Sequence, residues 1–336
     1  MIRRSETTAS PPALLLALLL LVLALSGCPQ RQEIIEQTVA VKADNVASQA
    51  EASHVPEELL TWEMVDEIDP GFAETRAVAF DAPGALYVAG DEAVRKMTAG
   101  GQVEWELPVG GEPTCVTVDL EGTILVGMRQ IVEVYDQSGQ LLMTLAPEGQ
   151  NTWITSIAAW PDDRFVADAG SRRILRYDRT GNPLSDFAGM DHERGIPALS
   201  IPSPHLDVAV GPDGNLWLAN PGRLAVQIHS RTDGALLNSW RRVGNGVEGF
   251  GGCCNPTDIA VLPDGRVITS EKGLPRVKVY SAEGELLSVV VPPEEFARST
   301  VGIDLAIDPS GRVAVLDPHR SNIRIYQETV QEAGDR

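Results

Sequence analysis

A short unit of sequence recurs six times in this chain and limits the fold more than any other feature. Each copy has an apolar stretch, a tight turn that usually ends in glycine, and a second apolar stretch. The six turns lie at residues 81–84, 119–122, 161–163, 212–214, 263–265 and 309–311. Several copies continue with an alternating third stretch, such as 277–280, a glycine turn and a fourth stretch. Four strands repeated about every 40–50 residues are typical of a β-propeller.

The third copy carries a more specific pattern. Residues 163–178 read DRFVADAGSRRILRYD, which resembles the NHL-repeat family of six-bladed propellers, with Asp163 in place of the usual glycine. The resemblance covers about residues 60–327. It implies an all-β, six-bladed propeller of the NHL or TolB-like kind, with four antiparallel strands in each blade. Propellers host many unrelated activities, so the resemblance predicts the fold and leaves the function open.

The two ends of the repeat array predict how the ring closes. The sixth unit has three strand-like stretches and then becomes polar after Tyr326. Residues 62–68 are strand-like and have no partner stretches of their own. We therefore expect residues 62–68 to be the outer strand of the last blade, because pairing there removes an exposed sheet edge. The propeller is expected at 59–327, with a polar tail at 328–336.

The N-terminus has the order of a targeting segment. Arg3 and Arg4 precede an apolar run at 13–25, too short for a comfortable membrane span, and Leu25-Ser26-Gly27-Cys28 follows. This resembles the bacterial lipoprotein cleavage box. The resemblance implies a signal peptide at 1–27, lipidation of Cys28 and attachment to a membrane through the acyl chains. Residues 28–58 are predicted to be a flexible tether.

The expected location follows from these features. It is the extracytoplasmic side of the cell envelope, which is the periplasm if the source is Gram-negative, with the outer membrane favoured because Pro29 follows the cysteine. A formal charge of −20 argues against a nucleic-acid partner, which requires lysine and arginine stripes. We expect a monomer.

Three acidic residues recur at one position of the repeat. Seven residues before the end of each turn lie Ala77, Cys115, Ser156, Asp207, Asp258 and Asp304. Inner strands surround the channel of a propeller, so the three aspartates are expected near one mouth. They predict either a polar-ligand or cation site, with Ca²⁺ as the cation, or carboxylates that cap nearby backbone amides. No cofactor is required by the sequence.

The fifth unit has two further features. Cys253 and Cys254 follow a glycine-rich loop beside Asp258, and four readings remain open: a vicinal disulfide, packed or free thiols, a thiolate metal site with His205 nearby, or a bridge to Cys115. Glu271, Lys272, Arg276 and Lys278 cluster a few residues later. They predict either a positive spot that an anionic group binds, or a charge-paired surface hairpin.

Enzyme motifs are sparse. The sequence has no nucleophile elbow, zinc-protease helix or phosphate loop. Residues 254–280 are faintly similar to peptidyl-amidoglycolate lyase, and gluconolactonase-like propellers bind a metal through carboxylates at the channel mouth. We therefore expect a binding or scaffolding module for a protein or small molecule at the channel mouth. The alternatives are a metal-dependent, lactonase- or lyase-like enzyme, or a redox role for the cysteine pair.

Overall fold

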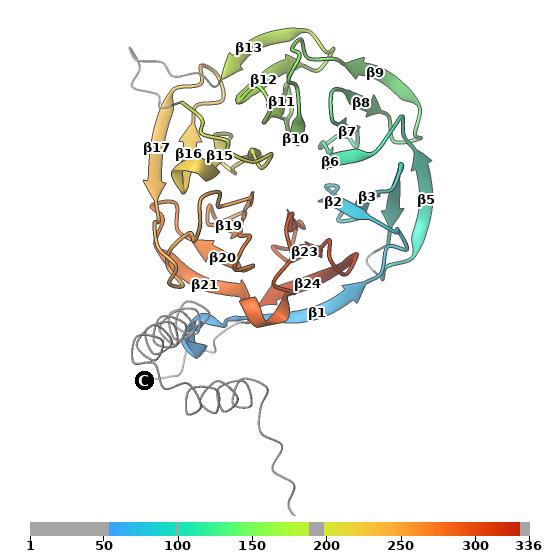
Figure 1. Ribbon diagram of the computed structural model, residues 1–336. Coiled ribbons are helices and arrows are strands. Elements are labelled where there is room, and N and C mark those ends of the chain that lie inside the picture. The colour runs from blue at the N-terminus through green and yellow to red at the C-terminus, as the bar shows by residue number, and fades with distance from the viewer. Residues whose placement is uncertain (1–53, 99, 188–197, 330–336) are drawn as a thin grey trace, which may run out of the picture. The chain divides into compact units, whose positions relative to one another are not determined.

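The computed structural model describes residues 54–98, 100–187 and 198–329, and it confirms the six-bladed propeller (Figure 1). Blade 1 contains β2 (Thr75–Phe80), β3 (Leu86–Gly90), β4 (Ala93–Met97) and β5 (Val103–Pro108). Blade 2 contains β6 (Pro113–Val118), β7 (Ile124–Met128), β8 (Val132–Tyr135) and β9 (Leu141–Leu145). Blade 3 contains β10 (Ile154–Trp160), β11 (Asp163–Asp168), β12 (Arg173–Asp178) and β13 (Pro183–Phe187).

The second half of the ring repeats this arrangement. Blade 4 contains β14 (Asp207–Val210), β15 (Leu216–Asn220), β16 (Ala225–His229) and β17 (Leu236–Arg241). Blade 5 contains β18 (Asp258–Val261), β19 (Val267–Ser270), β20 (Val277–Tyr280) and β21 (Leu286–Val291). Blade 6 contains β22 (Asp304–Ile307), β23 (Val313–Asp317), β24 (Asn322–Glu328) and β1 (Trp62–Ile68). The described ranges also contain three short 3₁₀ helices: η1 (Glu57–Leu59) before β1, η2 (Pro221–Arg223) between β15 and β16, and η3 (Pro293–Glu295) between β21 and β22.

Strand β1 closes the ring, as the sequence predicted. It pairs antiparallel with β24 from Trp62 opposite Glu328 to Ile68 opposite Ile323, with one irregularity between Met64 and Asp66. The N-terminal strand is thus the outermost strand of a blade whose other three strands come from the C-terminus (Figure 1). This arrangement pairs the edge of β24 that would otherwise be open.

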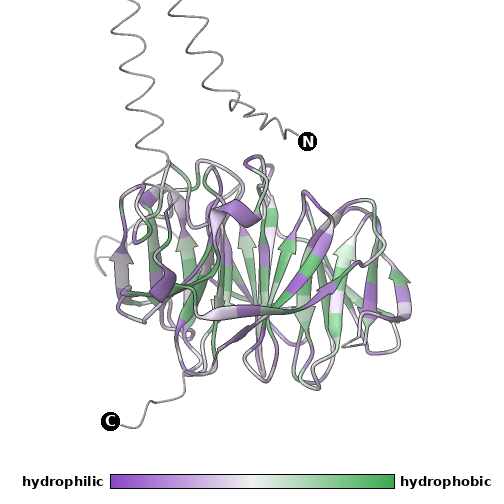
Figure 2. Cartoon of the chain, turned by 90° about the horizontal axis from the view of Figure 1, so that it is seen from below, coloured by the Kyte–Doolittle hydropathy of each residue, from purple (hydrophilic) through white to green (hydrophobic). Residues whose placement is uncertain are grey.

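The core lies between the blades. Among the described residues, six clusters of buried apolar side chains fill the six interfaces between neighbouring sheets. The second strand of most blades is buried along its whole length, because a neighbouring blade covers each of its faces. Apolar residues therefore concentrate in the middle of the strands and hydrophilic residues in many of the loops (Figure 2). Burial between sheets, rather than within one sheet, holds the ring together.

Blade 3 differs from its sequence prediction. Trp160 pairs directly with Asp163, so a two-residue turn replaces the five-residue connection seen in blade 4. Asp163 is therefore the first residue of β11 and does not take the place of a turn glycine. Its buried carboxylate accepts a hydrogen bond from Arg176 Nε at 2.7 Å and also pairs with Arg231.

Several sequence predictions lie outside the described residues. These are the signal peptide at 1–27, lipidation of Cys28, the tether as far as residue 53, and residues 330–336 of the tail. In the part of the chain that the structure describes, no helix is long and apolar enough to cross a bilayer. Strand β24 continues to Glu328, which is paired with Arg266.

Candidate functional site

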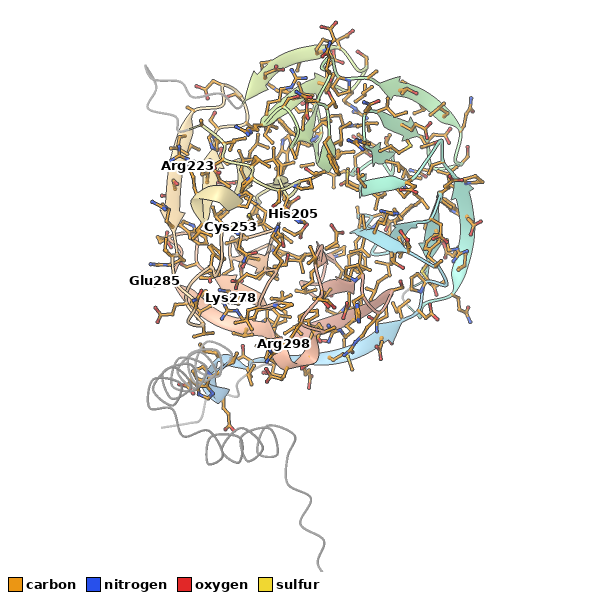
Figure 3. All side chains as sticks on the ribbon, viewed as in Figure 1. His205, Arg223, Cys253, Lys278, Glu285 and Arg298 are labelled. Carbon is orange, nitrogen blue, oxygen red and sulfur yellow. The ribbon has the colours of Figure 1, made fainter. Side chains whose placement is uncertain are left out.

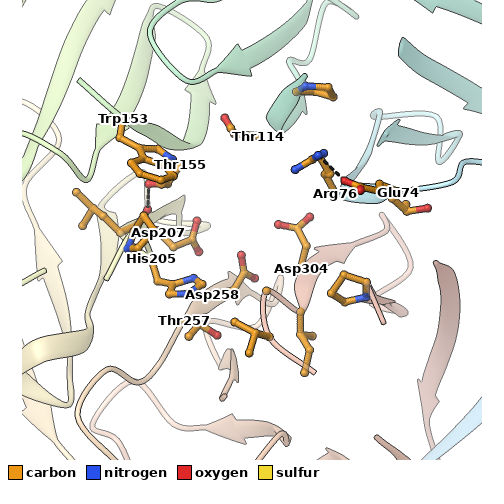
Figure 4. A pocket seen from close by; sticks show the side chains of 18 residues that line it. Glu74, Arg76, Thr114, Trp153, Thr155, His205, Asp207, Thr257, Asp258 and Asp304 are labelled. Atoms are coloured by element: carbon orange, nitrogen blue, oxygen red, sulfur yellow. Dashed lines mark hydrogen bonds and ion pairs between the residues drawn. The ribbon is translucent and has the colours of Figure 1, made fainter. Parts of the chain in front are cut away.

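The three predicted aspartates lie together at one mouth of the channel. Asp207, Asp258 and Asp304 are the first residues of the inner strands β14, β18 and β22. All three line a cavity of about 500 Å³, and their carboxyls point toward its centre (Figure 4). They also line a smaller cavity of about 250 Å³ that the six inner strands surround. The repeat therefore brings to one place side chains that are about 50 residues apart in the chain.

Each of these carboxylates bonds the backbone of the following blade. Asp207 accepts a hydrogen bond from Ile259 N at 2.6 Å, and Asp304 accepts one from Val78 N at 2.7 Å. Asp258 likewise accepts one from the backbone N–H of Leu305. In each case the donating amide in the next blade belongs to the residue that follows the repeat position of the aspartates. The carboxylates therefore join adjacent inner strands, including the junction between blade 6 and blade 1.

This capping extends beyond the expected one. The sequence suggested that each aspartate caps amides near itself, and Asp207 does bond the N–H of the adjacent Val208, but each of the three also bonds an amide of another blade. Ser156 in blade 3 does the same with a hydroxyl, which accepts a hydrogen bond from Val208 N at 3.3 Å. Asp258 and Asp304 are also hydrogen-bonded to each other through their carboxyls, which requires a proton between them. Oδ1 of Asp258 is buried and receives no hydrogen bond from an N–H or hydroxyl donor among the described residues, so loss of that proton leaves an acceptor for a ligand.

The three carboxyls hold protons unusually well. Burial raises the pKa of Asp207 to about 6, against the effect of hydrogen bonds from Ser156 and Ile259. Burial also raises the pKa of Asp304 to about 7, with a contribution from the charge of Asp207. The pKa of Asp258 is raised well above its ordinary value, first by burial and then by the two neighbouring carboxylates. Like charges at this spacing favour a shared proton.

The stability of the propeller should therefore depend on pH through this cluster. A carboxyl whose pKa is raised in the folded state stabilises the fold fully below about pH 4, and this contribution is lost as the pH rises through about 6 and 7. We expect Asp304→Asn to gain about 2 kcal/mol relative to the parent chain between pH 5 and pH 8, because asparagine carries no charge to bury. Thermal unfolding from pH 5 to pH 8 measures this.

The control for that experiment is Asp213→Asn, which removes an exposed carboxylate in a turn of blade 4. Its unfolding temperature should follow the parent's at every pH. A parallel pH profile for Asp304→Asn and the parent would show that the cluster does not titrate in this range.

Other cavity residues lie one to three positions before the repeat position that the aspartates occupy, at the start of the inner strands or just before them. They include Arg76, Thr114, Trp153, Thr155 and His205 (Figure 4). Arg76 is paired with Glu74 at 2.5 Å and with Glu112 at 3.3 Å. Arg76, Trp153 and both threonines were not among the predicted site residues, because that prediction used a single repeat position in each blade. Reading the one to three preceding positions in each copy would have found them.

His205 is neutral under ordinary conditions. Burial and the charge of Lys272 lower its pKa to about 4. Its ring lies on the cavity wall beside Asp207 (Figure 4). At pH 7 the ring therefore offers a hydrogen-bond donor and an acceptor, without a positive charge.

The cluster around Glu271 corrects a second prediction. Glu271, Arg276 and Lys278 are at most 1% exposed, so they form neither a positive spot on the surface nor a surface hairpin. Glu271 contacts Arg276 Nη2 at 3.0 Å and Lys278 Nζ at 2.6 Å. Neither Glu271 nor Arg276 lines the central cavity. Lys272 is half-buried, and its Nζ donates to Ser203 Oγ at 2.8 Å.

The position of Glu271 in the repeat explains its burial. Asp168 and Asn220 occupy the same place at the ends of β11 and β15, and both are fully buried. Asp168 accepts a hydrogen bond from Trp153 N, and Asn220 from Ser200 N, both at 2.9 Å. Glu271 similarly accepts one from the backbone N–H of the loop before β18. These side chains anchor the loops that form the cavity rim.

Cys253 and Cys254 lie in the loop before β18, and Figure 3 shows Cys253 on the side of Lys278 that faces the centre of the ring. Cys253 is exposed and Cys254 is buried, and their sulfur atoms are 2.8 Å apart. Cys115 is buried and not bonded to either of them. In the described ranges, no group of three or more His, Cys, Asp or Glu side chains has the arrangement of a metal site.

The comparisons with known proteins support the fold. No family model matches the sequence, and no curated protein matches it. Among solved structures, one titled "Streptogramin B lyase structure" is similar to this chain, with a TM-score of 0.58 and 13% sequence identity. The match covers 81% of this chain and 99% of that one. At this level of identity the similarity shows a shared propeller fold.

Proposed function

We propose that this chain is a lipid-anchored binding module of the bacterial cell envelope, of the NHL-repeat kind, and that its ligand is a small organic amine. The support for the anchor is the order of charge, apolar run and Leu25-Ser26-Gly27-Cys28 in the sequence. The support for the ligand is the cavity, whose volume of about 500 Å³ is in the range of small-molecule sites. The observation that carries the proposal is the cluster of three buried carboxyls that line this cavity, of which Asp258 and Asp304 are hydrogen-bonded to each other.

An ammonium group suits this cavity for electrostatic reasons. Three carboxyls at one mouth repel one another when ionised, and a bound cation removes that repulsion. Trp153 is 36% exposed and lines the same cavity, where an aromatic face adds an attraction for a cation. Binding of an amine should therefore release protons from the cluster.

The experiment is isothermal titration calorimetry with a panel of primary amines, diamines and amino sugars, and with polyols of matched size. We expect an amine to bind more tightly at pH 8 than at pH 5.5, and to release protons that the buffer's ionisation enthalpy reveals. Asp258→Asn should weaken this binding about 10- to 100-fold, because a charge-assisted hydrogen bond contributes about 1.5–3 kcal/mol. Asp213→Asn is the matched control.

Two results contradict this proposal. Binding of the polyols alone, without proton release, would indicate a neutral ligand. Stoichiometric binding of calcium chloride that Asp258→Asn abolishes would indicate a cation site of the kind that the three aspartates also predict.

An enzymatic role has less support. A lyase- or lactonase-like propeller needs a group that moves a proton, and His205 is the neutral base at the cavity. Its pKa of about 4 makes it a weak base, because efficient proton transfer favours a pKa near the working pH. Asp207 and Asp304 have pKa values of about 6 and 7, in that range, but their carboxylates already accept hydrogen bonds from backbone amides that join neighbouring blades. The propeller is therefore proposed to bind its ligand without converting it.

A further inference from the structure

The loop that carries the two adjacent cysteines is held unusually firmly. Asn255 Nδ2 donates to Gly251 O at 2.6 Å and to Lys272 O at 3.0 Å, while its Oδ1 accepts a hydrogen bond from Lys272 N at 2.9 Å. Gly251 N donates to Glu271 Oε2 at 3.2 Å. The residues on both sides of the cysteine pair are thus bonded to the turn that follows β19.

The buried charges of blade 5 hold the preceding part of the same loop. Arg276 donates to Gly246 O at 3.2 Å and to Gly249 O at 3.1 Å. Lys278 Nζ donates to Val247 O at 3.1 Å and to Gly249 O at 2.7 Å. Burying three charged side chains is costly, and the donors of the two cations, Arg276 and Lys278, are directed at carbonyls of the loop. The arrangement fixes the backbone that leads to Cys253.

The sulfur atoms lie closer than packing alone explains. Their separation of 2.8 Å is well below the roughly 3.5–4.0 Å at which carbon atoms pack, and sulfur is larger than carbon. Cys253 is exposed, so an external reagent has access to it. Cys254 is buried behind it, in the place of a resolving thiol.

We propose that Cys253 and Cys254 form a reversible redox site, which closes to a vicinal disulfide by exchange with an external disulfide. The Cys253 thiolate attacks one sulfur of the external disulfide, forms a mixed disulfide and releases the first thiolate. Cys254 then attacks Cys253 Sγ, forms the Sγ–Sγ bond and releases the second thiolate. The two cysteines are oxidised, the external disulfide is reduced to two thiols, and the two thiol protons pass to the leaving thiolates.

The closed form should be easy to reduce. Adjacent Cα atoms across a trans peptide are about 3.8 Å apart, whereas ordinary disulfides join Cα atoms about 4.4–6.8 Å apart. A strained disulfide is reduced more readily, which is typical of a regulatory rather than a structural bond. The hydrogen bond between the two thiols raises the pKa of Cys253, so exchange is slow at neutral pH and is best read at equilibrium.

The proposed redox site is independent of the proposed amine ligand, because neither cysteine lines the central cavity.

To test the redox site, the full chain is equilibrated in mixtures of reduced and oxidised glutathione. The samples are then quenched with acid, denatured and alkylated, and the intact mass is measured. We expect the number of alkylated cysteines to fall by two in a single step, without a glutathione adduct. Cys115→Ser should show the same fall, and Cys253→Ser and Cys254→Ser should show none.

Glu271→Gln tests whether the buried cluster positions the pair. It keeps the shape of the side chain and weakens the anchor of the loop, so closure should require at least about threefold more oxidised glutathione. Glu285→Gln, an exposed change in the same blade, should leave the midpoint unchanged. Three alternative results would overturn the proposal: alkylation of both cysteines in every mixture, a stable glutathione adduct on Cys253, or a fall by two that persists in Cys254→Ser.

Discussion

Replacing Glu271 with leucine should destabilise the propeller by about 3–5 kcal/mol, as measured by urea unfolding at pH 7. The carboxylate contacts Arg276 and Lys278, and all three side chains are at most 1% exposed. Removing it leaves two buried cations without a counter-charge, which is among the most costly changes in a protein interior. Urea is the suitable denaturant because it does not screen charges.

The pH dependence of this loss provides a second readout. Burial already lowers the pKa of Lys278 to about 8, and the charge of Glu271 acts against that shift. Without Glu271 the pKa of Lys278 should fall further, so the lysine can become neutral inside the fold. The deficit of Glu271→Leu should therefore shrink between pH 7 and pH 9.5.

The matched control is Glu285→Leu, at an exposed position of the same blade, which should change stability by no more than about 0.5 kcal/mol. If Glu271→Leu and Glu285→Leu unfold at the same urea concentration, the buried cluster does not hold blade 5 together.

Deleting residues 62–68 from the full chain should have the larger effect and remove most of the cooperative unfolding transition. Strand β1 supplies the outer strand of blade 6. Trp62 is buried in the apolar cluster between blades 5 and 6, and its Nε1 donates to Ser288 Oγ on β21 at 3.0 Å. Ile68 is buried in the cluster between blades 6 and 1. The loss of these contacts and of the hydrogen bonds between β1 and β24 should lower the unfolding temperature by more than about 15 °C.

The exposed edge of β24 should also make the shortened chain associate, because an unpaired strand edge is a template for another chain. Size-exclusion chromatography with light scattering measures this association. Deleting residues 54–60, which leaves β1 intact, is the control and should change the unfolding temperature by only a few degrees. An unfolding temperature within 5 °C of the parent for the 62–68 deletion would mean that β1 does not close the ring.

Much of the candidate site could be predicted from the sequence repeat. The spacing of Asp207, Asp258 and Asp304 placed them at the same position of three inner strands, and the structure brings them together around one cavity. Their hydrogen bonds to the following blade could not be predicted, because the donors are backbone amides, which every residue type except proline carries. The hydrogen bond between the carboxyls of Asp258 and Asp304 likewise depends on how the ring brings the two side chains together.

The charges of blade 5 show the opposite case. Glu271, Arg276 and Lys278 have the composition of a surface hairpin, and the sequence therefore predicted one. The structure buries them because the long glycine-rich loop before β18 folds back over β20 and offers its carbonyls to their donors. Burial of a charged residue depends on what covers it, and the covering segment lies about 30 residues away in the chain.

By itself, the sequence determined the number of blades, the order of strands and the closing partnership of residues 62–68. These follow from local periodicity, turn chemistry and one unpaired stretch, which are properties of neighbouring residues. The tertiary structure decided which polar groups remain available, which charges are buried and how the two cysteine sulfurs meet. Those outcomes depend on contacts between segments far apart in the chain, and the balance between desolvation and hydrogen bonding is set only when the ring is closed.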